Sequence, residues 1–321
     1  AQIANDTTSS DLKTFQLAPF EGSDAGFSLI ILLLGGFILG TGSGLFLAIV
    51  RGYVLEKGIR NRIEWSQNFQ IPLLGELLYH NDDQLTPWEL IEGGSADMNQ
   101  YYQTESIRSV RAQITLLGRA SDKKRLLIAS ALPEEGKTTL ATSLALSFAR
   151  LKAPTLLIDL DLRKPSVHEA LRLPNEMGMS DLLTEKASAK DVIQELEDGA
   201  LHVITGGALI PHAPELLSTT TLEEILDELS PSYERIIIDS APLLPVADTK
   251  LIAPFADCSL LAVRANRTEL PSIETTLVEL GAAGSQVAGA VLNFVRVSDA
   301  KSTQERSGYG YAYGQPSVSK S

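Results

Sequence analysis

The sequence predicts an α/β fold: a P-loop NTPase-type domain with a mostly parallel central sheet flanked by helices, preceded by one transmembrane helix. Three observations predict it. Short apolar runs alternate with helix-like stretches between residues 104 and 296, a phosphate-binding loop follows the first run, and residues 27–50 form a long apolar segment. Strands that alternate with helices are typical of βαβ units in a parallel sheet.

The apolar segment at 27–50 contains no charged residue and is long enough to cross the hydrocarbon core of a bilayer. Basic residues follow it at 51, 57, 60 and 62, whereas Glu21 and Asp24 precede it, so the positive-inside rule places the following region in the cytoplasm. The alternative is a buried core helix of a soluble protein. Residues 1–26 then form the end of an extracytoplasmic region, and 51–103 a juxtamembrane segment and linker, in which the apolar run 71–78 docks on the main domain.

Within residues 104–296, near-continuous apolar runs predict the strands of a sheet. This composition is expected of strands that are covered on both faces. The expected strands are 125–130, 155–161, 201–205, 235–240, 258–264 and 287–293. Beyond this domain, residues 297–321 are polar and are predicted to form a flexible tail.

The loop after strand 125–130 has the composition of a phosphate loop, with a helix predicted to begin near Lys137. Backbone N–H groups at the helix start would point at phosphates. The predicted nucleotide-binding residues of this loop are Pro133, Glu134, Glu135, Gly136, Lys137, Thr138 and Thr139. Ala131 stands where a standard loop opens with glycine, and a small residue can make that turn if its φ is negative. The alternative is a strand–turn–helix with a chance Gly-Lys-Thr.

Three carboxylates come at the ends of two other predicted strands, Asp159 and Asp161 on one and Asp239 on the other. Alternate residues of a strand share a face, so Asp159 and Asp161 could face the same point. Because the carboxyl ends of parallel strands form the ligand crevice, we expect the three to converge near the loop. Oxygen ligands suit Mg²⁺, although any single Asp could equally be a turn or helix cap.

Composition excludes other classes of function. The formal net charge of −13 argues against nucleic acid as a partner. The single cysteine, Cys258, sits in an apolar run and is expected to be a buried, reduced thiol. The four histidines lack metal-ligand spacing, so no zinc site is predicted.

The motifs "SALPEEGKTT", "LLIDLDLRKP" and "IIIDSAP", in this order, resemble the Walker A, A′ and B motifs of the bacterial tyrosine kinases, or BY-kinases. That family's loop commonly opens without glycine, whereas Glu134 departs from its usual glycine. The resemblance implies transfer of the γ-phosphoryl group of ATP to tyrosine, with Mg²⁺ as cofactor. We expect Lys137, Asp159 and Asp161 to be catalytic, with Asp159 orienting the hydroxyl and accepting its proton. The expected Mg²⁺ ligands are Thr138, Asp161 and Asp239, and related ATPases suggest that Asn293 binds adenine.

Two further segments extend the resemblance. "ESIRSVR", with Glu105, Arg108 and Arg111, matches the family's motif for ring assembly, whereas on its own it could be a solvated charged face. "RSGYGYAYG" places Tyr309, Tyr311 and Tyr313 in a polar tail, where they are expected phosphoacceptors.

The resemblance also implies a setting in the cell. It implies a bacterial inner-membrane protein with a cytoplasmic kinase domain, in a type whose extracytoplasmic domain and another span precede this chain. The implied partners are other copies in a ring, the lipid bilayer, the polysaccharide polymerisation and export machinery and a cognate tyrosine phosphatase. Two alternatives stay open: a chain-length regulator gated by nucleotide, and an ATPase switch of the MinD or ParA type, which normally carries an extra loop lysine that this sequence lacks.

Overall fold

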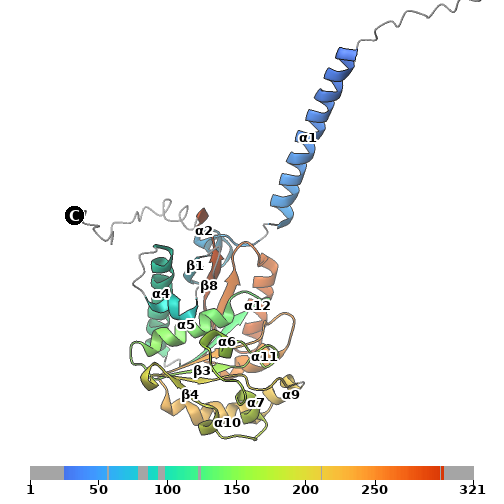
Figure 1. Ribbon diagram of the computed structural model, residues 1–321. Coiled ribbons are helices and arrows are strands. Elements are labelled where there is room, and N and C mark those ends of the chain that lie inside the picture. Colours follow the sequence, from blue (N-terminus) through green and yellow to red (C-terminus); the bar gives the residue numbers. More distant parts are fainter. Residues whose placement is uncertain are drawn as a thin grey trace, which may run out of the picture. The chain divides into compact units, whose positions relative to one another are not determined.

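The computed structural model describes residues 25–55, 58–78, 86–92, 98–121, 124–210, 212–296 and 298–299. The chain divides into two compact units, Ala1–Leu55 and Glu56–Ser321 (Figure 1). Tyr309, Tyr311 and Tyr313 lie outside the described residues, as does most of the expected extracytoplasmic region.

The first unit contributes one long helix, α1 (Ala25–Leu55), over the predicted transmembrane segment. Its large apolar side chains between Ile31 and Leu47 are exposed. Over the part of the chain that the structure describes, no helix has both the length and the apolar character needed to span a membrane.

The second unit is built on an eight-stranded sheet in the order β1-β8-β7-β2-β6-β3-β5-β4. Neighbouring strands run parallel except for β4, which is antiparallel to β5. The strands are β1 (Leu73–Leu78), β2 (Arg125–Ser130), β3 (Thr155–Asp159), β4 (Gln194–Leu196), β5 (Leu201–Ile204), β6 (Arg235–Asp239), β7 (Cys258–Arg264) and β8 (Val287–Val295). The prediction of a mostly parallel sheet is confirmed, and all six predicted strands are present.

Helices cover both faces of this sheet, because successive strand residues point to opposite sides. Leu126 and Ile128 pack into one apolar cluster with α4 and α5, whereas Leu127 and Ala129 pack into a second with α7, α9 and α10. The helices of the unit are α2 (Arg62–Asn68), α3 (Pro87–Glu92), α4 (Met98–Ser121), α5 (Lys137–Ala149), α6 (Val167–Leu171), α7 (Met179–Leu183), α8 (Ala189–Val192), α9 (Ala213–Leu217), α10 (Thr220–Leu229), α11 (Asp248–Ile252) and α12 (Leu270–Ala282). Three short 3-10 helices lie at Glu197–Gly199, Ser230–Ser232 and Ala253–Phe255.

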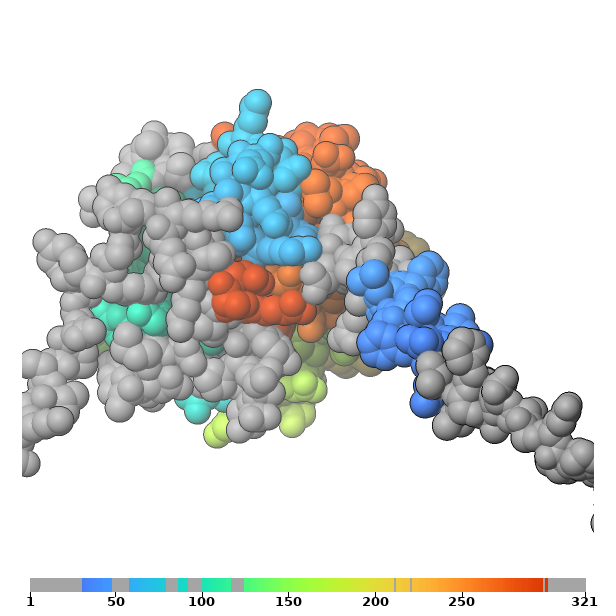
Figure 2. All heavy atoms as spheres, turned by 90° about the horizontal axis from the view of Figure 1, so that it is seen from above, coloured from blue at the N-terminus to red at the C-terminus, as the bar shows by residue number. Residues whose placement is uncertain are grey.

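The segment expected to be a linker, 51–103, supplies part of the sheet. Within it, β1 pairs in parallel with β8, and α4 begins at Met98, before the predicted domain boundary at 104. Trp65 of α2 is buried in a cluster with Leu261 and Ile273 of β7 and α12. Figure 2 shows the light-blue surface of this segment against the orange and red surface of residues near the end of the fold. The compact unit therefore starts at Glu56, within the expected juxtamembrane segment and linker, because β1 of that segment covers the edge of β8.

Candidate functional site

The phosphate loop joins β2 to α5 at the centre of the sheet, as predicted. Gly136 precedes α5 with a left-handed φ of 82°, and a Cβ there would lie 2.6 Å from the Asn293 amide nitrogen. Only glycine has both the conformational freedom and the small size for this position. Ala131, which replaces the usual opening glycine, is fully buried and is not among the described residues with positive φ, so a methyl group is tolerated there.

The two loop glutamates turn away from the space above the loop. Glu135 is buried, and its carboxylate accepts hydrogen bonds from the Leu132 N–H at 3.0 Å and from the Thr268 hydroxyl. Glu134 is exposed, and Arg267 donates to its carboxylate at 3.0 Å. Glu135 therefore braces the loop, and Glu134 pairs with surface arginine. The sequence alone did not predict that Thr268 holds the loop through its hydrogen bond to Glu135.

Glu134 adopts φ 62°, the left-handed region that favours glycine. This is the position at which the sequence departs from the family's usual glycine. Arg264 donates to its backbone carbonyl at 3.1 Å, which helps to hold the unusual conformation. The backbone at position 134 therefore has the conformation that glycine usually adopts, although the residue is glutamate.

Lys137 opens α5 and is 7% exposed. Among the residues that the structure describes, no carboxylate forms an ion pair with its ammonium, and its charge only partly offsets the desolvation that raises the pKa of Asp239 and of Asp161. A buried ammonium without an ion-pair partner, at the start of a helix, is suited to bind an anion.

Thr138 contacts Asp239 directly. Its hydroxyl donates to the Asp239 carboxylate at 2.6 Å and lies 2.9 Å from the Ser166 hydroxyl. Asp239 ends β6 next to β2, and it is fully buried. The sequence predicted Thr138 and Asp239 as site residues. It did not predict Ser166, whose only signal is its position directly after the "DLDLRKP" motif.

Asp159 ends β3 and stands opposite Asp239 in the strand register. Its two oxygens accept three backbone N–H bonds, from Asp161 at 3.1 Å and from Ser166 and Val167 at 3.0 Å each. Asp161 lies beyond the end of the strand, where its carboxylate accepts the Lys164 N–H at 3.0 Å. The strand ends at Asp159, although the Leu160 N–H still donates to the Asp239 carbonyl at 2.8 Å, and the turn begins at Leu162.

Burial raises the pKa values of Asp159 and Asp239. Desolvation, together with the charge of Asp239, raises the pKa of Asp159 to about 8. Desolvation also raises the pKa of Asp239 to about 6, against the lowering effect of Lys137 and of the Thr138 hydrogen bond. Two buried carboxylates that resist ionisation would be stabilised by a cation beside them.

Asp159 stands opposite Asp239, and the charge of Asp161 contributes to the raised pKa of Asp239, whose main cause is desolvation. Within the described ranges, no group of three His, Cys, Asp or Glu side chains could hold a metal ion. The Asp159 oxygens instead accept the backbone N–H groups of Asp161, Ser166 and Val167. The residues still fit Mg²⁺ in one respect: Thr138, Asp239 and nearby Asp161 present only oxygen atoms, and Mg²⁺ commonly completes its shell with water and phosphate oxygens.

A further ion pair fixes the chain after β3. The Arg163 guanidinium donates to both oxygens of the buried Asp248 carboxylate, at 2.8 and 3.0 Å. Bidentate pairs of this kind fix geometry as well as charge. This link to α11 was not predicted, because Asp248 lies in no recognisable motif.

The Glu105, Arg108 and Arg111 motif lies on α4, but its members point differently. Arg108 is ion-paired with Glu105 at 2.5 Å on the surface. Arg111 instead donates to the Ser147 carbonyl at 2.7 Å and to its hydroxyl at 3.0 Å. The Glu105–Arg108 pair is exposed on the surface of α4, whereas Arg111 holds α4 against α5.

Asn293 lies in β8 with its side chain at the phosphate loop. Its amide donates to the Glu135 carbonyl at 2.6 Å, and its buried side-chain oxygen has no hydrogen-bond partner among the residues that the structure describes. The observed contact supports the loop. The Asn293 Oδ1 atom is therefore available to accept a hydrogen bond from a ligand.

Comparison with known proteins agrees with this geometry. A model of the family described as "AAA domain" matches residues 134–279. The tyrosine-protein kinase YwqD of Bacillus subtilis is 35% identical over 211 residues, which cover 66% of this chain and 86% of YwqD. The tyrosine-protein kinase etk of Escherichia coli K12 is 31% identical over 191 residues, or 60% of this chain and 26% of that protein, so the chain matches about a quarter of etk. The solved kinase domain of Escherichia coli ETK superposes with a TM-score of 0.66 at 25% identity, over 75% of this chain and 96% of that domain.

Proposed function

The chain belongs to the bacterial tyrosine kinases, and from this premise we propose that it phosphorylates tyrosines of its own tail, with ATP as the phosphoryl donor. The observation that carries the proposal is the arrangement at the start of α5. There the buried Lys137 lies beside Thr138, whose hydroxyl contacts Asp239 at 2.6 Å. The acceptors are Tyr309, Tyr311 and Tyr313, which the chain carries in a polar segment after the fold.

The loop binds the phosphates of ATP through backbone N–H groups of residues 133–139 and through Lys137. Lys137 then stabilises negative charge on the moving phosphoryl group. Asn293, with its unpaired side-chain oxygen, is the proposed contact for the adenine. When bound, Mg²⁺ neutralises phosphate charge, and Thr138, Asp161 and Asp239 are the residues proposed to hold it, partly through water.

In the proposed reaction the tyrosine oxygen attacks the γ-phosphorus. A new P–O bond forms as the bond to the β–γ bridging oxygen breaks, and ADP leaves. Asp159 orients the hydroxyl and accepts its proton. A carboxylate whose pKa is raised to about 8 is suited to hold a proton near neutral pH. The Oδ1 atom accepts one backbone N–H and Oδ2 accepts two, so Oδ1 has a lone pair left for the proton.

The proposed setting is the bacterial inner membrane, with α1 as a single span and the kinase unit in the cytoplasm. The exposed apolar side chains between Ile31 and Leu47 support the span. Gly36, Gly40 and Gly44 leave open space on α1, which suits close approach of a second helix. We propose ring assembly in which Glu105 and Arg108 on the α4 surface meet a neighbour, with Arg111 supporting that helix.

The proposed role of this activity is to control polymerisation and export of exopolysaccharide or capsule. The proposed partners are that machinery and a cognate tyrosine phosphatase. Phosphorylation adds up to two negative charges per tyrosine to a chain whose net charge is −13, so several modified tails in one ring would repel each other.

Intact mass spectrometry with Mg²⁺ and ATP, beside a Lys137→Met variant, tests the proposal. We expect additions of about 80 Da, the mass of one phosphoryl group, on the segment that contains Tyr309–Tyr313, and none in the variant. ATP binding without any addition would contradict the kinase proposal and would favour a regulator gated by nucleotide.

A further inference from the structure

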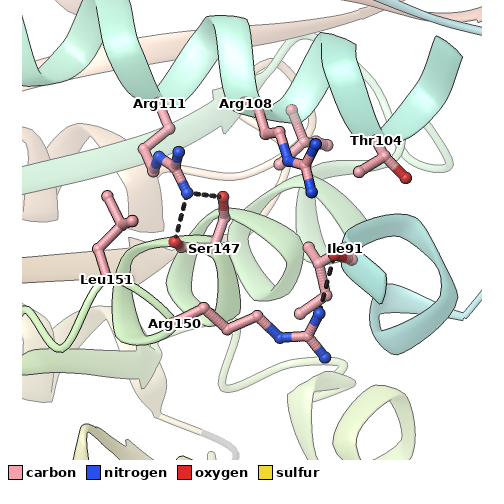
Figure 3. Close-up of a pocket in the computed structure, with 8 residues that line it drawn as sticks. Ile91, Thr104, Arg108, Arg111, Ser147, Arg150 and Leu151 are labelled. Carbon is pink, nitrogen blue, oxygen red and sulfur yellow. Dashed lines mark hydrogen bonds between the residues drawn. The ribbon is translucent and has the colours of Figure 1, made fainter. Parts of the chain in front are cut away.

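A second polar site lies away from the phosphate loop, between α4 and the end of α5. It is a cavity of about 190 Å³ lined by Ile91, Thr104, Ile107, Arg108, Arg111, Ser147, Arg150 and Leu151. Figure 3 shows the three guanidinium groups around this hollow, two from α4 and one from the end of α5. We call it the arginine pocket.

The arginine pocket carries more positive charge than its neighbours neutralise. Three of its lining residues are arginines, and none is acidic. Glu105 pairs with Arg108 from the surface, and Glu197 lies 3.9 Å from Arg150. In the described part of the chain, no carboxylate lies within ion-pair distance of Arg111, which bonds only to the carbonyl and hydroxyl of Ser147. The C-terminal end of α5 supplies only about half a negative charge.

Two of the arginines are held in place before any ligand arrives. Arg111 is fixed by its two bonds to Ser147, and Arg150 donates to the Ile91 carbonyl at 2.8 Å. Burial, and then repulsion by Arg108, lowers the pKa of the Arg111 guanidinium, so an anion in the pocket would relieve an existing electrostatic cost. Prepositioned guanidinium groups suit phosphate binding, because their planar N–H donors match the phosphate oxygens.

Apart from Thr104, the remaining lining is apolar and consists of Ile91, Ile107 and Leu151. An aromatic ring that carries a phosphate satisfies both kinds of wall, with its ring against the aliphatic side chains and its phosphate oxygens on the arginines. Such a group carries about −1.5 to −2 charges at pH 7 and three acceptor oxygens. A free carboxylate offers less charge and leaves the apolar walls uncovered.

We propose that the arginine pocket binds a phosphotyrosine of the chain's own tail, presented by the same or a neighbouring copy. This inference rests on the proposed function, which would supply the modified tail. Tyr309 follows the end of β8 at Val295 by 14 residues, a length of chain that reaches up to about 50 Å when extended. In a chain of net charge −13, an arginine-rich pocket attracts the one segment that becomes more negative.

The proposal connects modification with assembly. Arg108 belongs both to the arginine pocket and to the α4 surface proposed to meet a neighbouring subunit. A phosphotyrosine bound there would compete with that subunit for the same guanidinium. The modified tail would then separate the ring by occupying its interface, in addition to repulsion between tails.

Binding of a labelled tail peptide to the purified full chain tests the inference, and it does not depend on kinase activity. The probe is a peptide of residues 305–317 phosphorylated at Tyr311, compared with its unphosphorylated form and with inorganic phosphate as competitor. We expect the phosphopeptide to bind at least about tenfold more tightly than the unphosphorylated peptide, as charge-assisted hydrogen bonds imply. We expect inorganic phosphate to displace it only at much higher concentration. Equal binding of the two peptides, or displacement by phosphate at matched concentration, would overturn the phosphotyrosine assignment.

Variants locate the site. Arg108→Gln and Arg150→Gln should each weaken phosphopeptide binding about tenfold, whereas Lys186→Gln, which removes one exposed charge elsewhere, should leave it unchanged. Binding should persist in Lys137→Met. If binding is lost in Lys137→Met but kept in Arg108→Gln, the phosphotyrosine sits at the phosphate loop as a reaction product and the inference is wrong. A chain that binds the phosphopeptide but shows no addition of mass with ATP would keep the pocket and contradict the proposed function.

Discussion

At the scale of the residue, the short contact between Thr138 and Asp239 joins the phosphate loop to a buried carboxylate. The fully buried Asp239 keeps a pKa of about 6 even though Lys137 and the Thr138 hydroxyl both favour its charged form. Desolvation therefore outweighs these two favourable contacts. Without a bound cation, the site holds negative charge at a cost to folding.

That cost predicts how stability depends on pH. Because the folded pKa of Asp239 lies above the unfolded value of 3.8, its protonated form stabilises the fold below about pH 4, and this contribution is lost as pH rises through about 6. Asp239→Asn does not titrate, and its amide can donate to the Thr138 hydroxyl. We expect this variant to be more stable than the parent at pH 8 by on the order of 1–3 kcal/mol, with a smaller difference at pH 5.

Urea denaturation at the two pH values, without nucleotide or Mg²⁺, measures the difference. Asp198→Asn, which removes a carboxylate whose side chain is 96% exposed, is the matched control and should change little at either pH. A parent chain that is more stable than Asp239→Asn at pH 8 would show that Asp239 is not under electrostatic strain. The kinase reaction of Asp239→Asn should still be lost, since Asp239 is a proposed Mg²⁺ ligand.

Residues within short motifs were the easiest to predict from sequence. Lys137 and Thr138 lie at the start of α5 because the loop and its helix are contiguous in the chain. Asp161 is harder to place, since strand periodicity does not indicate that β3 ends at Asp159, two residues before it. Thr268 and Asp248 could not be predicted, because their partners lie 133 and 85 residues away in the sequence.

At the scale of the element, β1 shows how closely the edge of the sheet is packed. A Cβ on Gly75 of β1 would lie 2.5 Å from a methyl carbon of Val110 and 3.0 Å from the Ser106 hydroxyl, both on α4. The Ser106 hydroxyl also bonds to the backbone of Glu76, donating to its carbonyl at 2.8 Å. The β1 backbone at Gly75 therefore packs directly against side chains of α4, which leaves no room for a Cβ.

Gly75→Ala should force β1 away from α4 and destabilise the fold by about 1–3 kcal/mol, as expected for overpacking. Gly281→Ala is the matched control, because no atom lies within 4 Å of an added Cβ at this position near the end of α12. It should be neutral or up to about 1 kcal/mol more stable. Thermal denaturation of both variants gives the comparison, and equal stability would mean that β1 can shift without cost.

The elements missed from sequence share a physical cause. The run at 71–78 was recognised as apolar and as docking on the main domain, but its pairing with β8 involves residues more than 200 positions apart. Strand β4 has three residues and no fully buried side chain, so it lacks an apolar run. Strands with continuous apolar sequence were predicted well because burial on both faces requires that composition.

At the scale of the whole molecule, the fold depends on the chain before residue 104. Strand β1 covers the edge of β8, and Ile59, Trp65 and Leu73 complete the cluster that includes Leu261, Ile273 and Leu292. Removal of this segment would expose both a hydrogen-bonding strand edge and an apolar surface. Exposed edges of this kind promote aggregation.

Three fragments of the chain distinguish the contribution of strand β1 to stability from that of the start of α4. Residues 56–321 contain the entire second unit and should unfold cooperatively and remain monodisperse in size-exclusion chromatography. Residues 98–321 keep all of α4 but lose α2, β1 and α3, and residues 104–321 also lose the first turns of α4. We expect both shorter fragments to aggregate or to lose cooperative unfolding, because each lacks β1. If 98–321 unfolds cooperatively within a few degrees of 56–321 while 104–321 does not, the start of α4 stabilises the unit and the edge strand is dispensable.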